Sequence, residues 1–246
     1  MIPKIIHYCW LSTDPIPSDL QNYIDGWQQK MPDYQIIKWD FSRFEKQSSK
    51  WVSDAFDHKK YAFAADYIRA YALYNYGGFY LDSDVEVLKS FDSLLNHDYL
   101  LCYENGKNTI EAGIMASSKG NPLFKILLDY YDSNSFIQVD GSFNMKVIPV
   151  IIRDIIIKNY SLKSVNNPSE ISNTNSEVCV LPFYYFSPKS SFDGSYDIRE
   201  DTYAVHHFKA SWLPKYMVLE RTFWNFFGLK NYAILYRLNN IFKKKI

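Results

Sequence analysis

The first forty residues or so alternate between short apolar stretches and a segment with helical spacing. Residues 2–10 are rich in β-branched and aromatic side chains, which predicts a strand. Apolar residues then recur at three- and four-residue steps from Leu20 to Met31, which predicts a helix that Pro32 ends. A second strand is predicted at residues 34–39. Strand, helix and strand in such close succession indicate a parallel α/β sheet.

A long helix and a short strand are predicted next along the chain. Residues 61–76 are rich in alanine, which favours a helix and allows a close neighbour, and Gly77-Gly78 ends it. The apolar residues 79–82 follow at once as a strand. Asp82 and Asp84 therefore lie at or just beyond the carboxyl end of that strand, which is where open α/β sheets bind ligands.

The rest of the chain continues the α/β pattern and ends in a helical, basic segment. The segment 161–176 is rich in Ser and Asn and is predicted to be a loop. Beyond Lys215 two aromatic-rich helical stretches lead to a run of three lysines, so we divide the chain into a domain at 1–214 and a C-terminal helical, basic extension at 215–246. Between these landmarks, strands are predicted at 99–103, 112–116, 178–183 and 202–208, and helices at 122–131 and 147–158.

Composition narrows the setting in which we expect the protein to work. The 27 basic and 27 acidic residues cancel, so no overall field attracts nucleic acid and we expect no nucleic-acid partner. Three cysteines without CxxC spacing indicate free thiols in a reducing cytoplasm. The opening residues lack signal-peptide features, and the longest apolar run, 147–157, falls short of the roughly 20 residues that span a bilayer. We therefore expect a cytoplasmic protein without a transmembrane helix.

The acidic pair is the first candidate for chemistry. Residues two apart in an extended chain point to the same side, which places the carboxylates of Asp82 and Asp84 about 7 Å apart at Cα and able to share one ion. Hard oxygen ligands suit Mg²⁺ or Mn²⁺, and such an ion neutralises charge on a departing diphosphate. Taken alone the pair is weak evidence, because most acidic pairs in loops are merely solvated.

A second pair precedes it on the long helix. Asp66 and Arg69 are three residues apart and therefore share a face. The arginine can bind phosphate and the aspartate can accept hydrogen bonds from sugar or ribose hydroxyls, although a structural salt bridge is the simpler interpretation. Because Gly77-Gly78 turns this helix directly into the acidic strand, we expect both pairs to border one cleft.

Residues 65–84, from Ala65-Asp-Tyr-Ile-Arg to Tyr-Leu-Asp-Ser-Asp84, closely resemble the core signature of glycosyltransferase family 32. They are also similar to the catalytic domains of the clostridial glucosylating toxins. Three further segments match family blocks in the same order, namely 2–10, 113–117 and 206–212. The resemblance implies a GT-A-like fold, a Rossmann-type mixed sheet flanked by helices, with the C-terminal helical extension added to it.

The resemblance also implies roles for individual residues. Asp66 and Arg69 would contact the donor sugar and phosphates and, with Asp82 and Asp84, form the catalytic set. Asp82 would lie in the ribose and metal region, and Asp84 would bind the metal directly. Trp10 matches the position whose ring lies beside the nucleotide base, although a core tryptophan is the simpler interpretation. The remaining donor-binding residues implied are Tyr8, Tyr80, Ser211 and Trp212.

The family closes its metal site with a ligand from the late segment that contains His206 and His207. Adjacent strand residues face opposite ways, so only one of these imidazoles can reach the ion, and we favour His207. The chain departs from the family at Glu111-Ala112, where relatives often carry asparagines. Glu104, Glu111 and Asp140 are further carboxylates near the expected cleft, and none is assigned as a nucleophile or base.

Together with these patterns, the resemblance implies a metal-dependent transfer of a hexose from a nucleotide-diphosphate sugar, with retention of the anomeric configuration. UDP is favoured as the nucleotide and GDP-mannose is second, with a glycan or lipid-linked glycan of bacterial capsular or surface polysaccharide as acceptor. Without a placed nucleophile, we expect front-face substitution, in which the metal and Arg69 stabilise the leaving diphosphate.

Two other functions remain open. One is a different metal and phosphate enzyme, such as a nucleotidyltransferase or phosphatase. The other is a non-catalytic sugar-binding protein on the same scaffold. The basic extension fits either peripheral contact with the anionic inner face of the plasma membrane or a helix packed on the domain with a solvated end.

Overall fold

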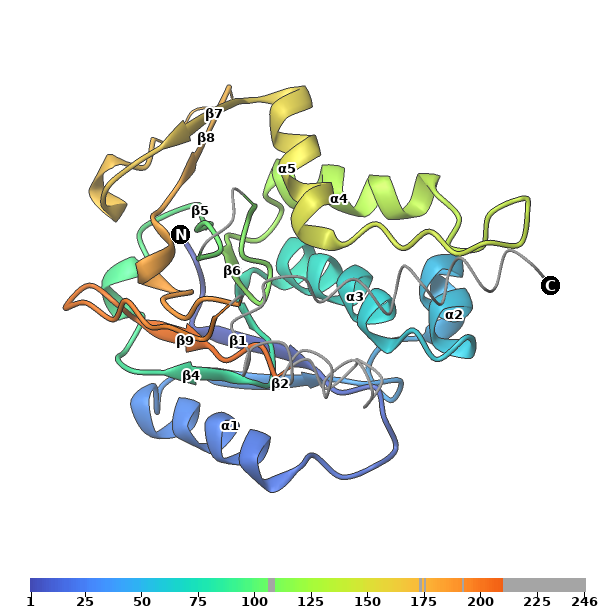
Figure 1. The fold of residues 1–246 in the computed structure, drawn as a ribbon, viewed down its shortest axis with the longest axis horizontal. Coiled ribbons are helices and arrows are strands. Elements are labelled where there is room, and N and C mark those ends of the chain that lie inside the picture. Colours follow the sequence, from blue (N-terminus) through green and yellow to red (C-terminus); the bar gives the residue numbers. More distant parts are fainter. Residues whose placement is uncertain (106–108, 173, 175, 192, 210–246) are drawn as a thin grey trace.

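The computed structural model describes residues 1–105, 109–172, 174, 176–191 and 193–209. Five strands form its central sheet in the order β2-β1-β3-β6-β5 (Figure 1). β1 runs parallel to β2 and to β3, whereas β6 is antiparallel to β3 and to β5. The carboxyl ends of three parallel strands therefore meet at one edge. The strands are β1 (Ile5–Cys9), β2 (Gln35–Trp39), β3 (Gly78–Leu81), β5 (Tyr99–Leu100) and β6 (Ile114–Ser117).

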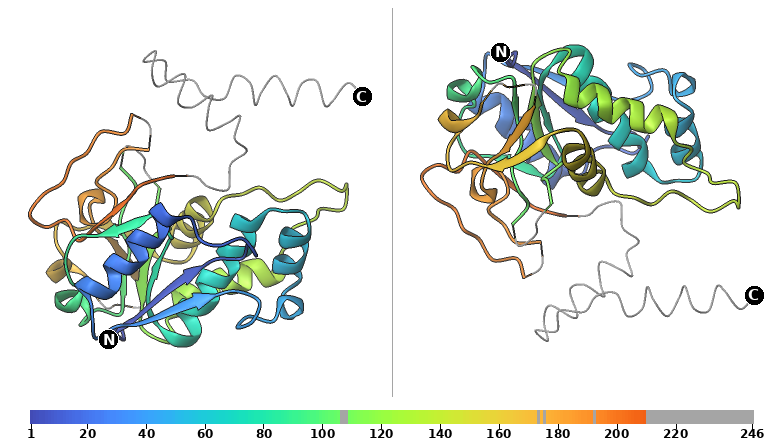
Figure 2. Two further views of the ribbon diagram at one scale, coloured as in Figure 1. Left: turned by 90° about the horizontal axis from the view of Figure 1, so that it is seen from below. Right: turned by 90° about the horizontal axis from the view of Figure 1, so that it is seen from above.

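Helices cover both faces of this sheet (Figures 1 and 2). One face packs against α2 (Lys50–Asp57), α3 (Tyr61–Tyr76), α4 (Pro122–Ser133) and α5 (Ile148–Asn159). The other face packs against α1 (Ser18–Lys30). Two small sheets complete the fold, one of β4 (Val85–Val87) with β9 (Ala204–His206) and one of β7 (Ser161–Ser164) with β8 (Glu177–Val180). Single 3-10 turns lie at Lys46–Ser48, Asp92–Leu94, Pro168–Glu170 and Phe183–Tyr185.

The two faces of the sheet carry separate hydrophobic cores because strand side chains alternate in direction. On β3, Phe79 and Leu81 pack in the core on the α1 side, whereas Tyr80 packs with α3. The side chain of Trp27 on α1 also donates a hydrogen bond to the carbonyl of Val85 at 2.8 Å. That bond holds α1 against β4, the strand that follows the acidic pair.

The turn from α3 into β3 depends on its two glycines. Gly77 and Gly78 have φ of 70° and 103°, which L side chains rarely adopt. A Cβ atom on Gly78 would lie 2.5 Å from the carbonyl oxygen of Ile5. The close approach lets β3 pair with β1 immediately after the helix, which sets the position of Asp82.

The predicted α/β architecture, with a mixed sheet between helices, is confirmed. The predicted loop at 161–176 is wrong in part, because it contains β7, whose four residues are exposed and leave no apolar alternation to recognise. α2 and the three-residue β4 were not predicted. Among the described residues, no helix is both long enough and apolar enough to cross a bilayer. The predicted extension at 215–246 lies outside the described residues.

Candidate functional site

Asp82 and Asp84 lie in the turn that connects β3 to β4. The Asp82 N–H donates to the carbonyl of Gly113 at 2.8 Å, and the Val85 N–H closes the turn on the Asp82 carbonyl at 3.0 Å. β4 then pairs antiparallel with β9, in a register that sets Val85 opposite His206. The pairing brings a segment more than a hundred residues later in the chain against the acidic pair.

Three side chains converge at this point on a space that one cation can occupy. Ligand atoms of Asp82, Asp84 and His206 all lie within 4.8 Å of one another. The Nε2 atom of His206 is 3.3 Å from Asp84 Oδ1 and 3.9 Å from Asp82 Oδ2. Two carboxylates and one imidazole form a ligand set that suits a divalent ion such as Mn²⁺.

His206, rather than the favoured His207, is the histidine at the acidic pair. The His207 ring points the opposite way, as neighbouring strand residues must, and its Nε2 lies 2.9 Å from Glu86 Oε2. It also stacks on Tyr23 at a centroid distance of 4.9 Å. The expectation that only one histidine reaches the pair agrees with this geometry, but our choice between the two was wrong because it required the β4–β9 register.

Asp84 is held in its ionised form. Burial opposes ionisation, but His206 and the backbone N–H of Lys209 offset it and lower the pKa of Asp84 to about 2. The Lys209 N–H donates to Asp84 Oδ2 at 2.7 Å. For His206, burial likewise opposes the charge, yet the carboxylates of Glu111 and Asp84 raise its pKa well above the usual value. In the absence of a cation, an imidazolium therefore balances these carboxylates.

Arg69 connects the helix pair to the acidic pair, as expected for two pairs that border one cleft. Its Nη2 atom lies 3.0 Å from Asp66 Oδ1 and 3.4 Å from Asp82 Oδ1. Its Nη1 donates to the carbonyl of Ala112 at 2.7 Å, and its guanidinium lies over the Tyr80 ring at 4.7 Å. The Tyr80 hydroxyl donates to Asp82 Oδ1 at 3.0 Å. Arg69 thus occupies a fixed orientation beside the acidic pair.

The electrostatics of the helix pair follow from burial. Burial raises the pKa of Asp66 above its ordinary value, although the adjacent Arg69 opposes that change. Despite burial, the charge of Asp82 and its neighbours raises the pKa of Arg69 well above its usual value, so the guanidinium stays charged. One permanent positive charge therefore lies next to the carboxylates, and a guanidinium can pair with phosphate oxygens.

The remaining predicted donor residues divide into three cases. Tyr8 is 8% exposed and packs edge-on against Trp27 at 5.7 Å, between β1 and α1. Trp10 lies just past β1, partly exposed, and its Nε1 donates to the carbonyl of Asp14 at 2.8 Å. Ser211 and Trp212 lie outside the described residues. The nucleotide contacts of these four residues remain predictions.

Two residues of the site had no role in the sequence-based interpretation. Glu111, left unassigned there, is buried against His206, with its Oε1 atom 3.0 Å from Nδ1. Gly113 lies against the same imidazole and against Asp82. In the sequence, Glu111 stands out because relatives often carry asparagine there. Its contact with His206 could be identified only from the fold. Of the other carboxylates considered, Glu104 accepts a bond from Ser191, and Asp140 belongs to an exposed turn.

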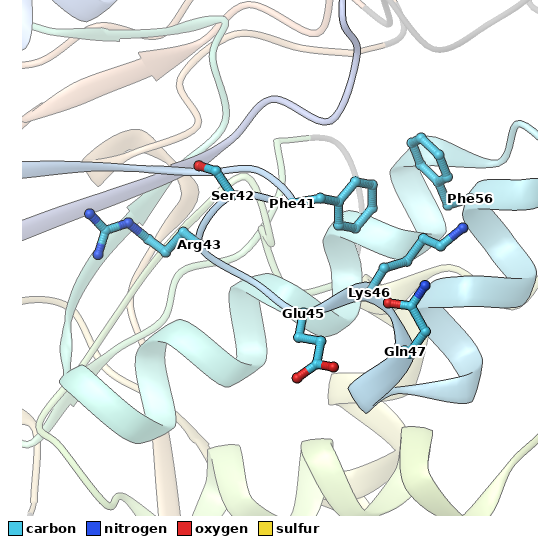
Figure 3. Close-up of a pocket in the computed structure, with 7 residues that line it drawn as sticks. All are labelled: Phe41, Ser42, Arg43, Glu45, Lys46, Gln47 and Phe56. Carbon is cyan, nitrogen blue, oxygen red and sulfur yellow. The ribbon is translucent and has the colours of Figure 1, made fainter.

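A separate hollow of about 480 Å³ lies where the chain leads from β2 into α2 (Figure 3). Charged and aromatic side chains line it together, and none of them belongs to the predicted site. Lys46 is already paired there with Asp57 at 2.7 Å. The lining residues are Phe41, Ser42, Arg43, Glu45, Lys46, Gln47 and Phe56.

Comparison with known proteins agrees with this geometry. Residues 17–101 match the family described as the glycosyltransferase sugar-binding region containing the DXD motif. The matched region includes Asp66, Arg69, Asp82 and Asp84, but not His206, which the β4–β9 pairing adds.

Two curated relatives are similar over different lengths. Inositol phosphoceramide mannosyltransferase 3 of Schizosaccharomyces pombe is 31% identical over 125 residues, which are 49% of this chain and 35% of that protein. An uncharacterized glycosyltransferase of Acanthamoeba polyphaga mimivirus is 25% identical over 228 residues, which are 87% of this chain and 85% of that protein. The chain therefore spans only about a third of the mannosyltransferase.

Among solved structures, PaToxG glycosyltransferase superposes with a TM-score of 0.53 at 21% identity, over 64% of this chain and 68% of that one. This likeness concerns the fold, and it confirms the GT-A-like architecture. The DXD region, the curated relatives and the fold agree: residues 17–101 carry the DXD-containing sugar-binding region of glycosyltransferases, and the chain is similar to enzymes of that class.

Proposed function

We propose that the protein transfers a hexose from a nucleotide-diphosphate sugar, with a divalent ion held by Asp82, Asp84 and His206. The observation that carries the proposal is the convergence of these three ligand atoms within 4.8 Å, beside the fixed guanidinium of Arg69. A cation bound there neutralises charge on the departing diphosphate. The second carboxylate oxygen of Asp84 is already committed to the Lys209 N–H, which leaves the other oxygen for the ion.

Arg69 supplies the second positive charge. Its Nη atoms are held by Asp66, Asp82 and the carbonyl of Ala112, so no reorganisation is needed when phosphate charge develops beside it. Its Nε atom and the Tyr131 hydroxyl are buried and have no hydrogen-bond partner among the described residues. Buried polar atoms of this kind are normally satisfied, so they fit an ordered water molecule beside Asp66.

The proposed stereochemistry is retention by front-face substitution. A double displacement requires a carboxylate that is free to attack the anomeric carbon. Asp82 and Asp84 belong to the proposed metal site, Asp66 is paired with Arg69, and Glu111 is bonded to three partners. Each of these carboxylates is committed to another contact, which favours the leaving diphosphate as acceptor of the incoming hydroxyl proton.

For the donor and the acceptor we propose chemical classes and no single compound. We favour a UDP-sugar, with GDP-mannose second, and a glycan or lipid-linked glycan of a bacterial surface polysaccharide as acceptor. The name of the fungal relative specifies mannosyl transfer to inositol phosphoceramide, which supports including GDP-mannose and a lipid acceptor in the tests. Metal dependence is part of the same proposal.

The test measures which products the protein releases from UDP-hexoses and GDP-mannose, with Mn²⁺ and with chelator. Transfer or donor hydrolysis releases a nucleoside diphosphate from these donors. A nucleotidyltransferase would instead transfer the nucleoside monophosphate and release hexose 1-phosphate, and a sugar-binding protein would release nothing. Asp84→Asn should lower the rate by roughly a hundredfold or more, because it replaces a charged ligand of an ion that contributes several kcal/mol.

Asp129→Asn is the matched control. Asp129 is an exposed carboxylate of α4 that pairs only with Lys125 among the residues described. The rate of Asp129→Asn should therefore equal that of the wild type. Turnover of Asp84→Asn at the wild-type rate would refute the proposed metal site.

A further inference from the structure

Glu111 is a buried carboxylate whose oxygens are all engaged. It is 2% exposed and lies in the loop that leads into β6. The Gly113 N–H donates to its Oε1 at 2.7 Å, and the Ser187 hydroxyl donates to its Oε2 at 2.7 Å. A buried charge is costly unless it is paired and hydrogen-bonded, and these two donors hold the carboxylate in one orientation.

The third partner of Glu111 is the imidazole at the acidic pair. The same Oε1 atom is 3.0 Å from Nδ1 of His206, while Nε2 of that ring faces Asp84 Oδ1 at 3.3 Å. A neutral imidazole carries a proton on only one of its two nitrogens. With Nδ1–H donating to Glu111, the lone pair is on Nε2, which is the nitrogen that faces the proposed ion.

The ring has little freedom to turn away from this arrangement. On one side it lies against Gly113, where a Cβ atom would be 2.6 Å from its Cε1. It also packs against the ring of Phe208 at a centroid distance of 4.1 Å. These neighbours confine the plane of the ring, but they do not select which nitrogen carries the proton. That selection falls to Glu111.

We propose that Glu111, anchored by Ser187 and by the Gly113 N–H, is a positioning residue that fixes the tautomer and direction of His206 toward the divalent ion. This inference rests on the proposed function, since it needs an ion at the Asp82, Asp84 and His206 site. Carboxylates behind a metal-bound histidine raise its basicity and orient it, and their loss typically lowers metal affinity by about 10- to 100-fold.

The same contacts argue against two other roles for Glu111. A nucleophile or general base needs an oxygen that reaches the substrate. Glu111 is almost fully buried, and both of its oxygens accept bonds from the protein. A purely structural carboxylate, in turn, would need only Ser187 and the Gly113 N–H. The contact with His206 is what distinguishes a positioning role.

The experiment measures Mn²⁺ binding to the full chain without donor, by electron paramagnetic resonance of the free ion. Glu111→Met removes both the charge and the acceptor for Nδ1–H of His206, and it should weaken Mn²⁺ binding most. Glu111→Gln keeps the size of the side chain, and its amide oxygen can still accept from the Gly113 N–H and from Nδ1–H, so only the charge is removed. We expect its Mn²⁺ dissociation constant to rise by about 10-fold or more. Electron spin echo spectroscopy of the bound ion should also show a weaker coupling to imidazole nitrogen than in the wild type.

Glu104→Gln is the matched control. Glu104 is also a buried carboxylate that accepts from a serine hydroxyl, at 2.8 Å from Ser191, and it is not a partner of His206 in any contact described above. Its Mn²⁺ affinity and nitrogen coupling should equal those of the wild type. Ser187→Ala, which frees one oxygen of Glu111, should weaken Mn²⁺ binding in the same direction as Glu111→Gln.

Two results would count against the inference, and they differ in what else they overturn. If both Glu111→Met and Glu111→Gln bind Mn²⁺ like the wild type while Asp84→Asn does not, the role of Glu111 is refuted and the metal site stands. If Asp84→Asn also binds Mn²⁺ like the wild type, the ion lies elsewhere, and the proposed metal site fails together with the role of Glu111.

Discussion

The backbone of Gly113 lies directly against the imidazole of His206. A Cβ atom on Gly113 would be 2.6 Å from Cε1 and 2.8 Å from Nδ1 of that ring, and 3.0 Å from Oδ2 of Asp82. The loop cannot retreat easily, because the Gly113 carbonyl accepts from the Asp82 N–H and its N–H donates to Glu111. Only glycine leaves space for two proposed metal ligands at once.

Gly113→Ala should therefore impair both metal binding and stability. The added methyl must displace His206 or Asp82, and overpacking of this kind typically costs about 1–3 kcal/mol in the free energy of unfolding. Urea unfolding and Mn²⁺ titration measure the two effects on the same samples.

The matched control for Gly113→Ala is Gly26→Ala, a half-buried position of α1. A Cβ atom there meets nothing within 4 Å, and alanine in a helix is more stable than glycine by about 0.5–1 kcal/mol. Gly26→Ala should thus raise the free energy of unfolding and leave Mn²⁺ affinity unchanged. Normal Mn²⁺ binding by Gly113→Ala would show that the ligands can move aside, contrary to the rigid arrangement described above.

The two adjacent histidines should behave differently on substitution. His206→Gln removes the imidazole that faces Asp84, so Mn²⁺ affinity should fall by roughly tenfold, equivalent to about 1.4 kcal/mol. His207→Gln alters only the contact with Glu86 and the stacking on Tyr23, and its Mn²⁺ affinity should match the wild type. Isothermal titration of each variant makes the comparison, and a larger loss in His207→Gln would reverse our assignment of the ligand.

The histidine pair also shows how far local sequence patterns can reach. The positions of Asp82 and Asp84 follow from one strand and one turn, and the shared face of Asp66 and Arg69 follows from helical spacing alone. These contacts lie within twenty or so residues of chain and were predicted. The choice between His206 and His207 instead depends on which residue of β9 faces Val85.

A register between strands that are distant in sequence is set by packing of the whole fold, and a shift by one residue turns every side chain to the other face. Contacts between distant segments also explain why the sequence singled out Glu111 but gave it no role. Its partners Ser187 and His206 lie 76 and 95 residues further along the chain. β7 was missed for a different reason, since its exposed residues carry no apolar pattern.

His7 should make the stability of the fold sensitive to acid. Its ring is fully buried, with Nε2 2.7 Å from the Gly77 carbonyl and Nδ1 accepting from Trp39 Nε1 at 3.0 Å. That arrangement needs neutral imidazole, because a proton on Nδ1 would face the Trp39 N–H. Burial lowers the pKa of His7 to about 4, only partly offset by the bond to Gly77.

The sign of the pH dependence follows from the pKa of His7 in the folded chain, about 4, and its ordinary value in the unfolded chain, about 6.5. As pH falls below about 6.5, the unfolded chain binds a proton at His7 and the folded chain does not, so stability is lost until about pH 4. The loss amounts to about 3 kcal/mol at most. His7→Gln can donate to Gly77 but cannot titrate, so the stability difference between wild type and variant should shrink by up to that amount on acidification.

Urea unfolding of both proteins between pH 7.5 and about 4.5 measures this difference. Asp66, whose pKa burial raises, also titrates on folding and favours the native state in acid, and Asp84 and His206 have shifted pKa values too, so the wild-type curve alone would mix several effects. These residues are present in both proteins and cancel in the comparison. Parallel curves for wild type and His7→Gln would mean that His7 takes up its proton equally in the folded and unfolded chains, and that its bonds to Trp39 and Gly77 do not exclude the charged form.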